Sequence, residues 1–397
     1  MLVFYFLAAI QLFFSYKSLK VGFEYLQYFK DELAKPSDNF QPFASVIVPC
    51  RGIDQDLEEN LQALFEQEYF DYEVVFVVDR YDDLSVATVE ELVSKYSNSK
   101  LIVAGEAGNC GQKVHNLRIA VLKISDNSDV IVFVDSDVRP GKNWLANLVA
   151  PLEDKGIGCT TGYRWFLQKR GGFATHLRSV WNASIASALG RNPEGNFCWG
   201  GSTAITRELF EKLGVQKKWD GTLSDDFALT AIMNDAGLPI RFVPQCLTAS
   251  VEDSNLSETL EFTTRQMKIT RVYSPGLWKV SVIGSVLFTI TFWGAAGLLF
   301  FLTGIHFWIM VLFLIVVFSL GAGKAWLRLN AVKLVLKSYH AQLKKQFLPQ
   351  ILFWTVSPIL FIYNNFRAMT SSRIVWRGIE YELKSEKETA FISRNAK

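Results

Sequence analysis

The sequence predicts an α/β protein attached to a membrane. Half of its 397 residues are hydrophobic although 20% are charged, and the apolar excess collects at the N-terminus and after about residue 278. Residues 40–260 instead resemble a soluble domain in which strand-like and helix-like segments alternate. That alternation is typical of βαβ units and a parallel sheet covered on both faces.

The net charge of +2 comes with no dense basic face, which argues against nucleic acid as a partner. The five cysteines are scattered and form no CxxC pair. We therefore expect neither a disulfide framework nor a zinc site.

Residues 1–20 are predicted to form an N-terminal anchor. Residues 2–15 carry no charge, and Lys17 and Lys20 follow them. A signal peptide has its positive charge before the apolar run, so this order favours an anchor with its N-terminus outside.

Two uncharged runs, 280–303 and 305–323, predict a transmembrane hairpin over residues 279–325. Basic residues lie on both sides of it, so both of its ends are expected in the cytoplasm. Residues 256–278, just ahead of the hairpin, are interpreted as interfacial helices.

A third apolar run, 347–363, is broken by Pro349 and Pro358 and has basic flanks on both sides. The flanking charges favour a re-entrant or interfacial pair of helices over a single crossing. Residues 326–397 are thus expected to comprise a basic loop, this segment and a cytosolic tail.

The soluble domain is predicted to span residues 40–255. Its first elements are expected as strands at 45–49, 72–79, 100–105 and 129–137, with helices at 54–67, 86–96 and 115–124. In a parallel sheet, ligands bind beyond the carboxyl ends of the strands, where several of these segments end in polar residues.

Asp135 and Asp137 follow the apolar run VIVFV and are candidate metal ligands. Two carboxylates one residue apart can share one Mg²⁺ or Mn²⁺ together with substrate phosphates. The alternative is a polar turn that ends the strand.

Asp79 ends another apolar run and is a candidate for binding a base or ribose, although nearby charges also suit a solvated loop.

Ser224, Asp225 and Asp226 precede a helical pattern. Ser224 or Asp225 is a candidate N-cap. Asp226 would lie in the first turn, where the helix dipole keeps it ionised, as a general base requires.

Two looser segments complete the predicted site. Lys113, in a glycine-containing loop before a helix, could contact phosphate or remain solvated. Gly201, in Cys-Trp-Gly-Gly-Ser, would let the backbone approach a ligand or simply form a tight turn.

The order of SVIVPCRG, VFVVD, VFVDSDVRP, WGGSTAI, SDDFALT and RQMKITR resembles family 2 glycosyltransferases of the ceramide glucosyltransferase type and their bacterial relatives, including hopanoid glycosyltransferases. The resemblance covers roughly residues 40–275, and the tail SSRIVWRGIEYEL is also similar. It implies a GT-A fold, a Rossmann-like nucleotide-sugar domain, here with membrane helices on both sides.

By position, the resemblance implies that Asp79 is the first family aspartate. Asp135 would be the second, with Asp137 as its metal-side partner, and Asp226 the third, catalytic one; Asp225 is included among the substrate-binding candidates. Arg265 and Lys268 stand in the family's (Q/R)xxRW position, with Lys and Ile replacing its Arg and Trp. Three residues apart on one helix face, they would face the diphosphate or belong to a juxtamembrane basic belt.

These observations together predict a metal-dependent, inverting glycosyltransferase. A nucleotide sugar, a UDP-sugar, would be its donor and a membrane lipid hydroxyl its acceptor, with the catalytic domain on the cytoplasmic side of a bacterial inner membrane or its equivalent. A processive polysaccharide synthase and a non-catalytic membrane scaffold are the alternatives. The sequence does not define the sugar, the lipid or the oligomeric state.

Overall fold

The computed structural model describes residues 1–35 and 40–394, so the last three residues of the predicted tail lie outside it. The chain divides into two compact units. One, here called the helical unit, comprises Met1–Asp31, Phe166–Ser187 and Val251–Ser371; the other, the sheet unit, comprises Glu32–Trp165, Ala188–Ser250 and Ser372–Lys397. The tail thus belongs to the sheet unit, and a short internal segment belongs to the helical unit.

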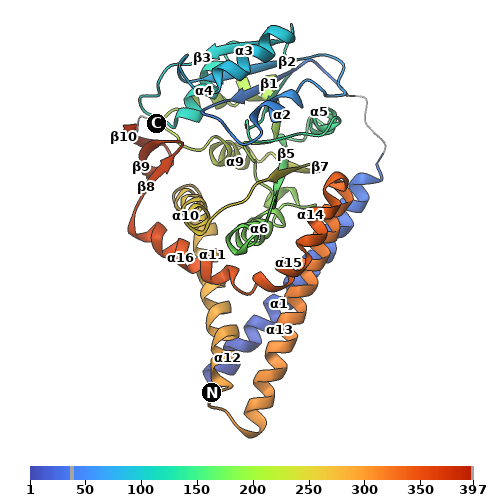
Figure 1. The fold of residues 1–397 in the computed structure, drawn as a ribbon, viewed down its shortest axis with the longest axis vertical. Coiled ribbons are helices and arrows are strands. Elements are labelled where there is room, and N and C mark those ends of the chain that lie inside the picture. Colours follow the sequence, from blue (N-terminus) through green and yellow to red (C-terminus); the bar gives the residue numbers. More distant parts are fainter. Residues whose placement is uncertain (36–39, 395–397) are drawn as a thin grey trace. The chain divides into compact units, whose positions relative to one another are not determined.

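The sheet unit is built on a seven-stranded sheet with the order β3-β2-β1-β4-β6-β5-β7 (Figure 1). The strands are β1 Ala44–Pro49, β2 Tyr72–Val78, β3 Ser99–Val103, β4 Val130–Phe133, β5 Cys159–Leu167, β6 Thr203–Thr206 and β7 Ile240–Val251. The predicted α/β class is confirmed, and β1 to β4 are parallel as expected. The sheet is mixed, however, because β6 runs antiparallel to both β4 and β5.

The helices of the sheet unit are short. They are α2 Leu57–Gln62, α3 Val86–Lys95, α4 Gln112–Ala120, α5 Trp144–Val149, α7 Arg207–Lys212, α8 Val215–Lys218 and α9 Asp225–Asp235, with 3-10 turns at Ala150–Glu153 and Pro193–Gly195.

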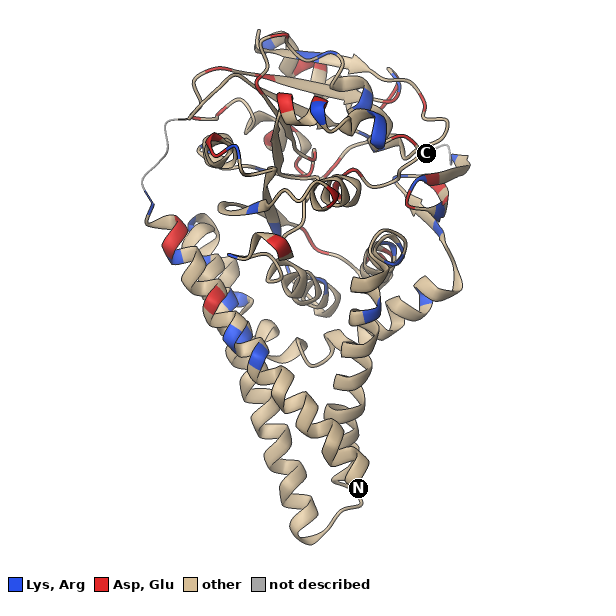
Figure 2. Ribbon diagram, turned by 180° about the vertical axis from the view of Figure 1, so that it is seen from behind, with Lys and Arg blue, Asp and Glu red and all other residues tan. Residues whose placement is uncertain are grey.

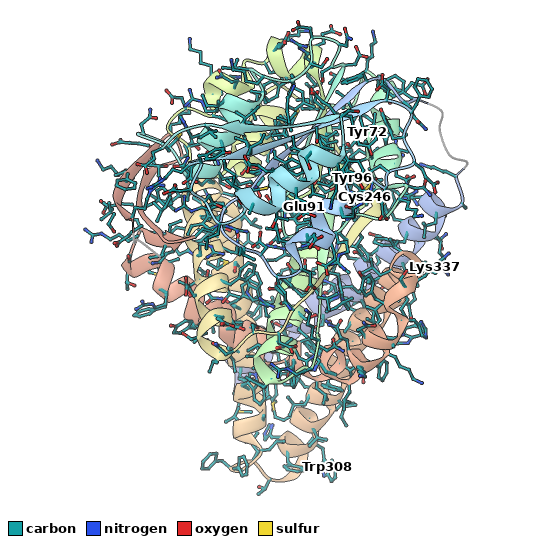
Figure 3. The ribbon with its side chains drawn as sticks, turned by 45° about the horizontal axis from the view of Figure 1, so that its top comes forward. Tyr72, Glu91, Tyr96, Cys246, Trp308 and Lys337 are labelled. Carbon is teal, nitrogen blue, oxygen red and sulfur yellow. The ribbon has the colours of Figure 1, made fainter. Side chains whose placement is uncertain are left out.

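The helix predicted over 54–67 is reduced to α2, because its end tightens into i to i+3 bonds. Two tyrosines labelled in Figure 3 hold that end: the Tyr72 hydroxyl donates to the carbonyl of Leu64 at 3.0 Å, and Gln62 donates to the Tyr96 hydroxyl at 2.5 Å.

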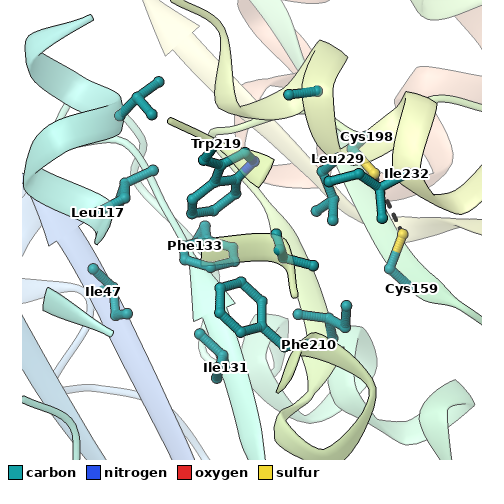
Figure 4. Close-up of a cluster of buried hydrophobic side chains, with 14 of the residues drawn as sticks. Ile47, Leu117, Ile131, Phe133, Cys159, Cys198, Phe210, Trp219, Leu229 and Ile232 are labelled. Carbon is teal, nitrogen blue, oxygen red and sulfur yellow. Dashed lines mark hydrogen bonds between the residues drawn. The ribbon is translucent and has the colours of Figure 1, made fainter. Parts of the chain in front are cut away.

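A buried apolar cluster lies between the sheet and helices α4, α7, α8 and α9 (Figure 4). Phe133 of β4 packs edge-on against Trp219, with 5.3 Å between ring centroids, and Phe210 contacts both rings. The indole nitrogen of Trp219 donates to the carbonyl of Asp225 at 3.2 Å. The core therefore fixes the first residue of α9.

A second sheet, ordered β10-β9-β8, is formed by the C-terminal segment: β8 Arg373–Trp376, β9 Ile379–Ser385 and β10 Glu388–Arg394. All of its pairings are antiparallel. The hydroxyl of Tyr381, on β9, accepts a hydrogen bond from the backbone N–H of Gln112 at 3.1 Å. This contact joins the small sheet to the start of α4.

The helical unit contains α1 Leu2–Leu33, α6 Phe173–Ala186, α10 Leu256–Tyr273, α11 Pro275–Phe288, α12 Gly294–Leu298, α13 Gly304–Val335, α14 His340–Lys345, α15 Phe347–Phe353 and α16 Ser357–Thr370. A π-helical turn, Thr289–Trp293, joins α11 to α12, and a 3-10 turn, Lys337–Tyr339, precedes α14.

Within residues 1–35 and 40–394, three helices are long and apolar enough to span a membrane: Leu2–Leu33, Pro275–Leu298 and Gly304–Val335. The first contains the predicted N-terminal anchor and extends beyond it to Leu33, and the other two overlap the region predicted as a hairpin. In Figure 2 the ribbon of α1 is tan from the N-terminus onward and carries its charges in the other half. Trp308, labelled in Figure 3, is exposed near the start of α13, as expected for an interfacial aromatic side chain.

The third apolar segment forms α15 and α16, two helices bent by 61° at a short break. Pro358 stands in the first turn of α16, where its missing N–H costs nothing. The pair is either a broken span or a re-entrant loop.

Candidate active site

The carboxyl ends of β1, β2 and β4 meet at one edge of the sheet. The N–H of Cys50, just after β1, donates to the carbonyl of Val77 at 2.9 Å, and the N–H of Val134, just after β4, donates to that of Ile47 at 3.1 Å. Asp79 follows β2 directly, and Asp135 lies two residues after the end of β4. The strand register therefore brings the polar residues after these strands to the same edge of the sheet.

Lys113 connects two of the predicted site aspartates. It lies in the first turn of α4, and its Nζ is 2.7 Å from Oδ1 of Asp135 and 3.2 Å from Oδ1 of Asp225. Burial would lower the pKa of Lys113, but the surrounding carboxylates outweigh it and raise that pKa. Burial alone would raise the pKa of Asp135, but the ammonium lowers it. Lys113 and Asp135 are therefore both held in their charged forms.

Asp137 has one carboxylate oxygen without a partner. Its Oδ2 lies 3.5 Å from the Arg164 guanidinium of β5, while its Oδ1 is buried and accepts no hydrogen bond from any described residue. Burial, assisted by the charges of Asp135 and Asp54, raises the pKa of Asp137 to about 6, although Arg164 opposes the shift. An unpartnered buried oxygen costs free energy unless a ligand satisfies it.

A divalent cation fits this pair of carboxylates. No cluster of three or more His, Cys, Asp or Glu side chains is poised for a metal among the described residues. Mg²⁺ and Mn²⁺ prefer oxygen, and Mg²⁺ in particular is commonly held by one or two carboxylates plus substrate phosphates. Asp135 and Asp137 supply that minimum, and the unpartnered Oδ1 of Asp137 is a ready ligand.

Asp226, the second residue of α9, has a different set of partners. Its Oδ1 accepts from the Ser224 hydroxyl and, at 2.7 Å, from the backbone N–H of Phe227; its Oδ2 lies 3.5 Å from the N–H of Gly200. The side chain is partly exposed.

The N-cap interpretation of this segment needs correction for Asp225. Ser224 occupies the N-cap position and makes no side-chain cap bond, because its hydroxyl donates to Asp226. Asp225 is buried, and its side chain points to Lys113 instead of capping the helix. Burial, assisted by the charges of Asp226 and Asp135, raises the pKa of Asp225 to about 6 against the opposing effect of Lys113.

The close approach of backbone to the site occurs at Gly200. A Cβ there would lie 2.6 Å from both Oδ2 of Asp225 and Nζ of Lys113, so a larger residue would displace this ion pair. At Gly201, the predicted residue, a Cβ would instead meet the indole of Trp199. That indole lies beneath the guanidinium of Arg164, 5.6 Å from its ring centroid.

Asp79 is more enclosed than the sequence suggests. It is 2% exposed, and its Oδ2 is paired with Arg51, just after β1, and at 2.8 Å with Arg394 of β10. Arg394 also donates to Oε1 of Gln112 at 2.8 Å. Asp79 therefore joins the main sheet to the C-terminal one, and the solvated-loop alternative is wrong.

The sequence reasoning missed several charged residues of this edge: Arg51, Asp54, Arg164, Arg377 and Arg394. Arg51 and Asp54 lie in the loop after β1, two and five residues beyond its end, and could have been found by the rule that identified Asp79. Arg394 is 315 residues from its partner Asp79, and no local pattern signals such a pairing.

Arg265 and Lys268 lie on α10, in the helical unit. The Arg265 guanidinium lies over the ring of Phe262, 5.6 Å from its centroid. Burial, with the charge of Arg367, lowers the pKa of Lys268. Their contact with a diphosphate remains a prediction.

The family model for glycosyl transferase family 21 matches residues 3–389, nearly the whole chain. The chain therefore belongs to glycosyl transferase family 21. The predicted resemblance to ceramide glucosyltransferases and bacterial glycosyltransferases is confirmed by this match and by the curated relatives.

Among these relatives, ceramide glucosyltransferase 3 of Caenorhabditis elegans is 26% identical over 48% of this chain and 42% of its own length. The probable glycosyltransferase YdaM of Bacillus subtilis is 26% identical over 57% of this chain and 55% of its own. The chain thus spans about half the length of the curated relatives it matches.

Among solved structures, a mannosyltransferase, PcManGT from Pyrobaculum calidifontis in complex with GDP-Man and Mn²⁺, is similar over 91% of this chain and 99% of its own, with 19% identity and a TM-score of 0.48.

Proposed function

We propose that the chain transfers a sugar from a nucleotide sugar, a UDP-sugar, to the hydroxyl of a membrane lipid, with inversion at the anomeric carbon. The observation that carries the proposal is the difference in environment between Asp135 and Asp137, which follow β4, and Asp226, which lies at the start of α9. Asp135 and Asp137 offer oxygens for a cation, whereas Asp226 is partly exposed and accepts hydrogen bonds from Ser224, Phe227 and Gly200. The names of the relatives, ceramide glucosyltransferases among them, support a lipid acceptor.

In this mechanism, Asp226 accepts the proton of the acceptor hydroxyl. The hydroxyl oxygen forms a bond to the anomeric carbon, and the bond from that carbon to the β-phosphate oxygen breaks, leaving its electron pair on the diphosphate. Asp226 is suited to this role because it is partly exposed and three donors fix the orientation of its carboxylate.

The other residues bind and orient the donor. Asp135 and Asp137 would hold the divalent cation, which supplies charge neutralisation to the departing diphosphate. Lys113 keeps Asp135 ionised and separates it from Asp225. The pairing of Asp79 with two arginines orders the strand ends where the base and ribose would lie.

The three candidate spans support an acceptor that reaches the site from a bilayer. Charge placement favours the cytoplasm for the basic loop and tail, and a cytoplasmic catalytic domain is part of this proposal.

The test is an assay with radiolabelled UDP-sugars, Mn²⁺ and a total lipid extract, using the full chain in detergent or nanodiscs. Label in a chloroform-soluble product that is lost with EDTA would support the proposal. Label in a water-soluble polymer would favour a processive synthase. A protein that binds UDP-sugar and Mn²⁺ but transfers no label to any lipid fraction would favour the scaffold alternative.

A further inference from the structure

The turn of the C-terminal hairpin contains an arginine in an unfavourable backbone conformation. Arg377 and Gly378 join β8 to β9, with φ angles of 47° and 76°. Two-residue hairpin turns that need positive φ at both central positions favour Asn-Gly. A long side chain is uncommon there, so the backbone of this turn gives no reason for arginine at position 377.

The Arg377 side chain instead reaches the loop after β1. Its Nη1 donates to the carbonyl of Arg51 at 2.7 Å, and its Nη2 lies 2.9 Å from Oδ1 of Asp54. The other oxygen of Asp54 accepts from the Ser136 hydroxyl at 2.6 Å. Ser136 stands between the two predicted metal ligands, so a continuous chain of contacts joins the hairpin turn to the Asp-Ser-Asp segment.

The charges around Arg377 show which part of the site it faces. Burial would lower its pKa, but the carboxylates of Asp54, Asp137 and Asp135 outweigh burial and raise it. Arg377 is therefore a fixed positive charge that acts on both metal-binding candidates and is joined to them through Asp54 and Ser136.

Among Lys113, Arg164 and Arg377, the side chain of Arg377 is the most accessible to a ligand. The side chains of Lys113 and Arg164 are 17% and 15% exposed, and both are in contact with site aspartates. The side chain of Arg377 is 34% exposed. A guanidinium has five N–H donors in a planar fork, more than its contacts with Arg51 and Asp54 use, and this fork matches phosphate oxygens.

We propose that Arg377 binds the diphosphate of the nucleotide-sugar donor, so that the C-terminal hairpin supplies part of the donor site. This inference rests on the proposed function and assigns one of its donor-binding residues to the tail. In this account, the unfavourable backbone conformation of Arg377 has a function, because the turn directs the guanidinium to the Asp-Ser-Asp segment. Residues in strained conformations are often found at binding sites in proteins.

The decisive variant is Arg377→Asn, because asparagine suits the positive φ and preserves the turn while removing the charge. Binding of UDP, UMP and uridine to the full chain in nanodiscs with Mn²⁺ would be measured by calorimetry. We expect UDP affinity to fall at least tenfold, since a charge-assisted contact is lost, and uridine affinity to stay within twofold. Arg373→Asn is the matched control: Arg373 is exposed on β8, pairs with Glu382 at 4.0 Å and should leave all three affinities unchanged.

Equal losses for UDP and uridine would show that Arg377 only supports the fold, and unchanged UDP affinity would also overturn the inference. If Arg377→Asn fails to fold, Arg377→Lys gives the same comparison, with a selective but smaller loss for UDP expected. A wild-type protein that binds none of the three ligands would instead overturn the proposed function, and this inference with it.

Discussion

The ammonium of Lys113 lies 2.7 Å from the Oδ1 atom of Asp135. The same nitrogen contacts Asp225, so one buried cation offsets two carboxylates that come from different strands and helices. This arrangement explains how the site can gather several aspartates in a small volume before any substrate binds. It also makes the site sensitive to the loss of one lysine.

We predict that Lys113→Gln destabilises the metal-free protein. Removing one partner of a buried charge pair typically costs about 3–5 kcal/mol. Thermal unfolding without metal should therefore begin several degrees lower, and added Mn²⁺ should recover part of the loss by supplying another cation. Lys100→Gln is the control, because Lys100 pairs with Glu73 at 2.7 Å but is 37% exposed. Equal stability of the two variants would contradict the buried-pair account.

Asp225 gives a pH-dependent prediction that differs from the effect of a helix cap. Its pKa rises from 3.8 to about 6 in the folded chain. Folding therefore favours the protonated form, and the contribution of Asp225 to the free energy of unfolding falls as pH rises from about 4 to about 6.

Asp225→Asn removes that loss, so its stability relative to wild type should rise over the same interval. A shift of this size corresponds to a relative gain on the order of 2–3 kcal/mol. Unfolding of both proteins, followed at several pH values without metal, would measure the difference. A difference independent of pH between 4 and 7 would contradict the buried, charge-coupled environment described for Asp225.

Asp135→Ala and Asp137→Ala should each abolish Mn²⁺-dependent UDP binding while the sheet unit stays folded. Both residues follow a strand and lie outside its apolar core, so their removal leaves the packing of β4 intact. Asp129→Ala, an exposed carboxylate at the other end of the same strand, should bind normally. Isothermal titration with UDP and Mn²⁺ provides the measurement, and normal affinity in both site variants would remove the metal from this account.

Topology can be tested with a cysteine at Ser385. Charge placement predicts a cytoplasmic tail, so Ser385→Cys should react with an impermeant maleimide only after cells are permeabilised. Thr303→Cys, in the exposed turn between α12 and α13, should react in intact cells. The native cysteines are buried and should contribute little background. Labelling of Ser385→Cys from outside would mean that residues 347–363 cross the membrane once.

The strands that define the site were predictable because each contains a run of apolar residues. The expected strand at 45–49 matches β1 within one residue, and those at 72–79 and 100–105 match β2 and β3 within two. The first helix was predicted too short, since Lys17 and the charges after it weaken membrane insertion without ending a helix. The antiparallel β6 was not foreseen, because strand direction depends on pairing that no local pattern encodes.

The site itself was predictable only in part. Asp79, Asp135, Asp137 and Asp226 follow or precede clear elements, so position indicated them. The pairings of Asp79 with Arg394 and of Asp54 with Arg377 join residues more than three hundred positions apart. Such contacts depend on how the C-terminal sheet packs, which the tail sequence alone does not specify.

The central claim is that Asp226 removes the proton of a lipid hydroxyl, and Asp226→Asn tests it most directly. The amide keeps the size of the side chain but cannot accept that proton at neutral pH. The transfer rate to lipid should fall by about 10²–10⁴, the usual contribution of general-base catalysis, while UDP affinity in Mn²⁺ stays close to that of wild type. Asp226→Asn turning over at the wild-type rate, in a preparation whose wild-type enzyme is active, would contradict the account.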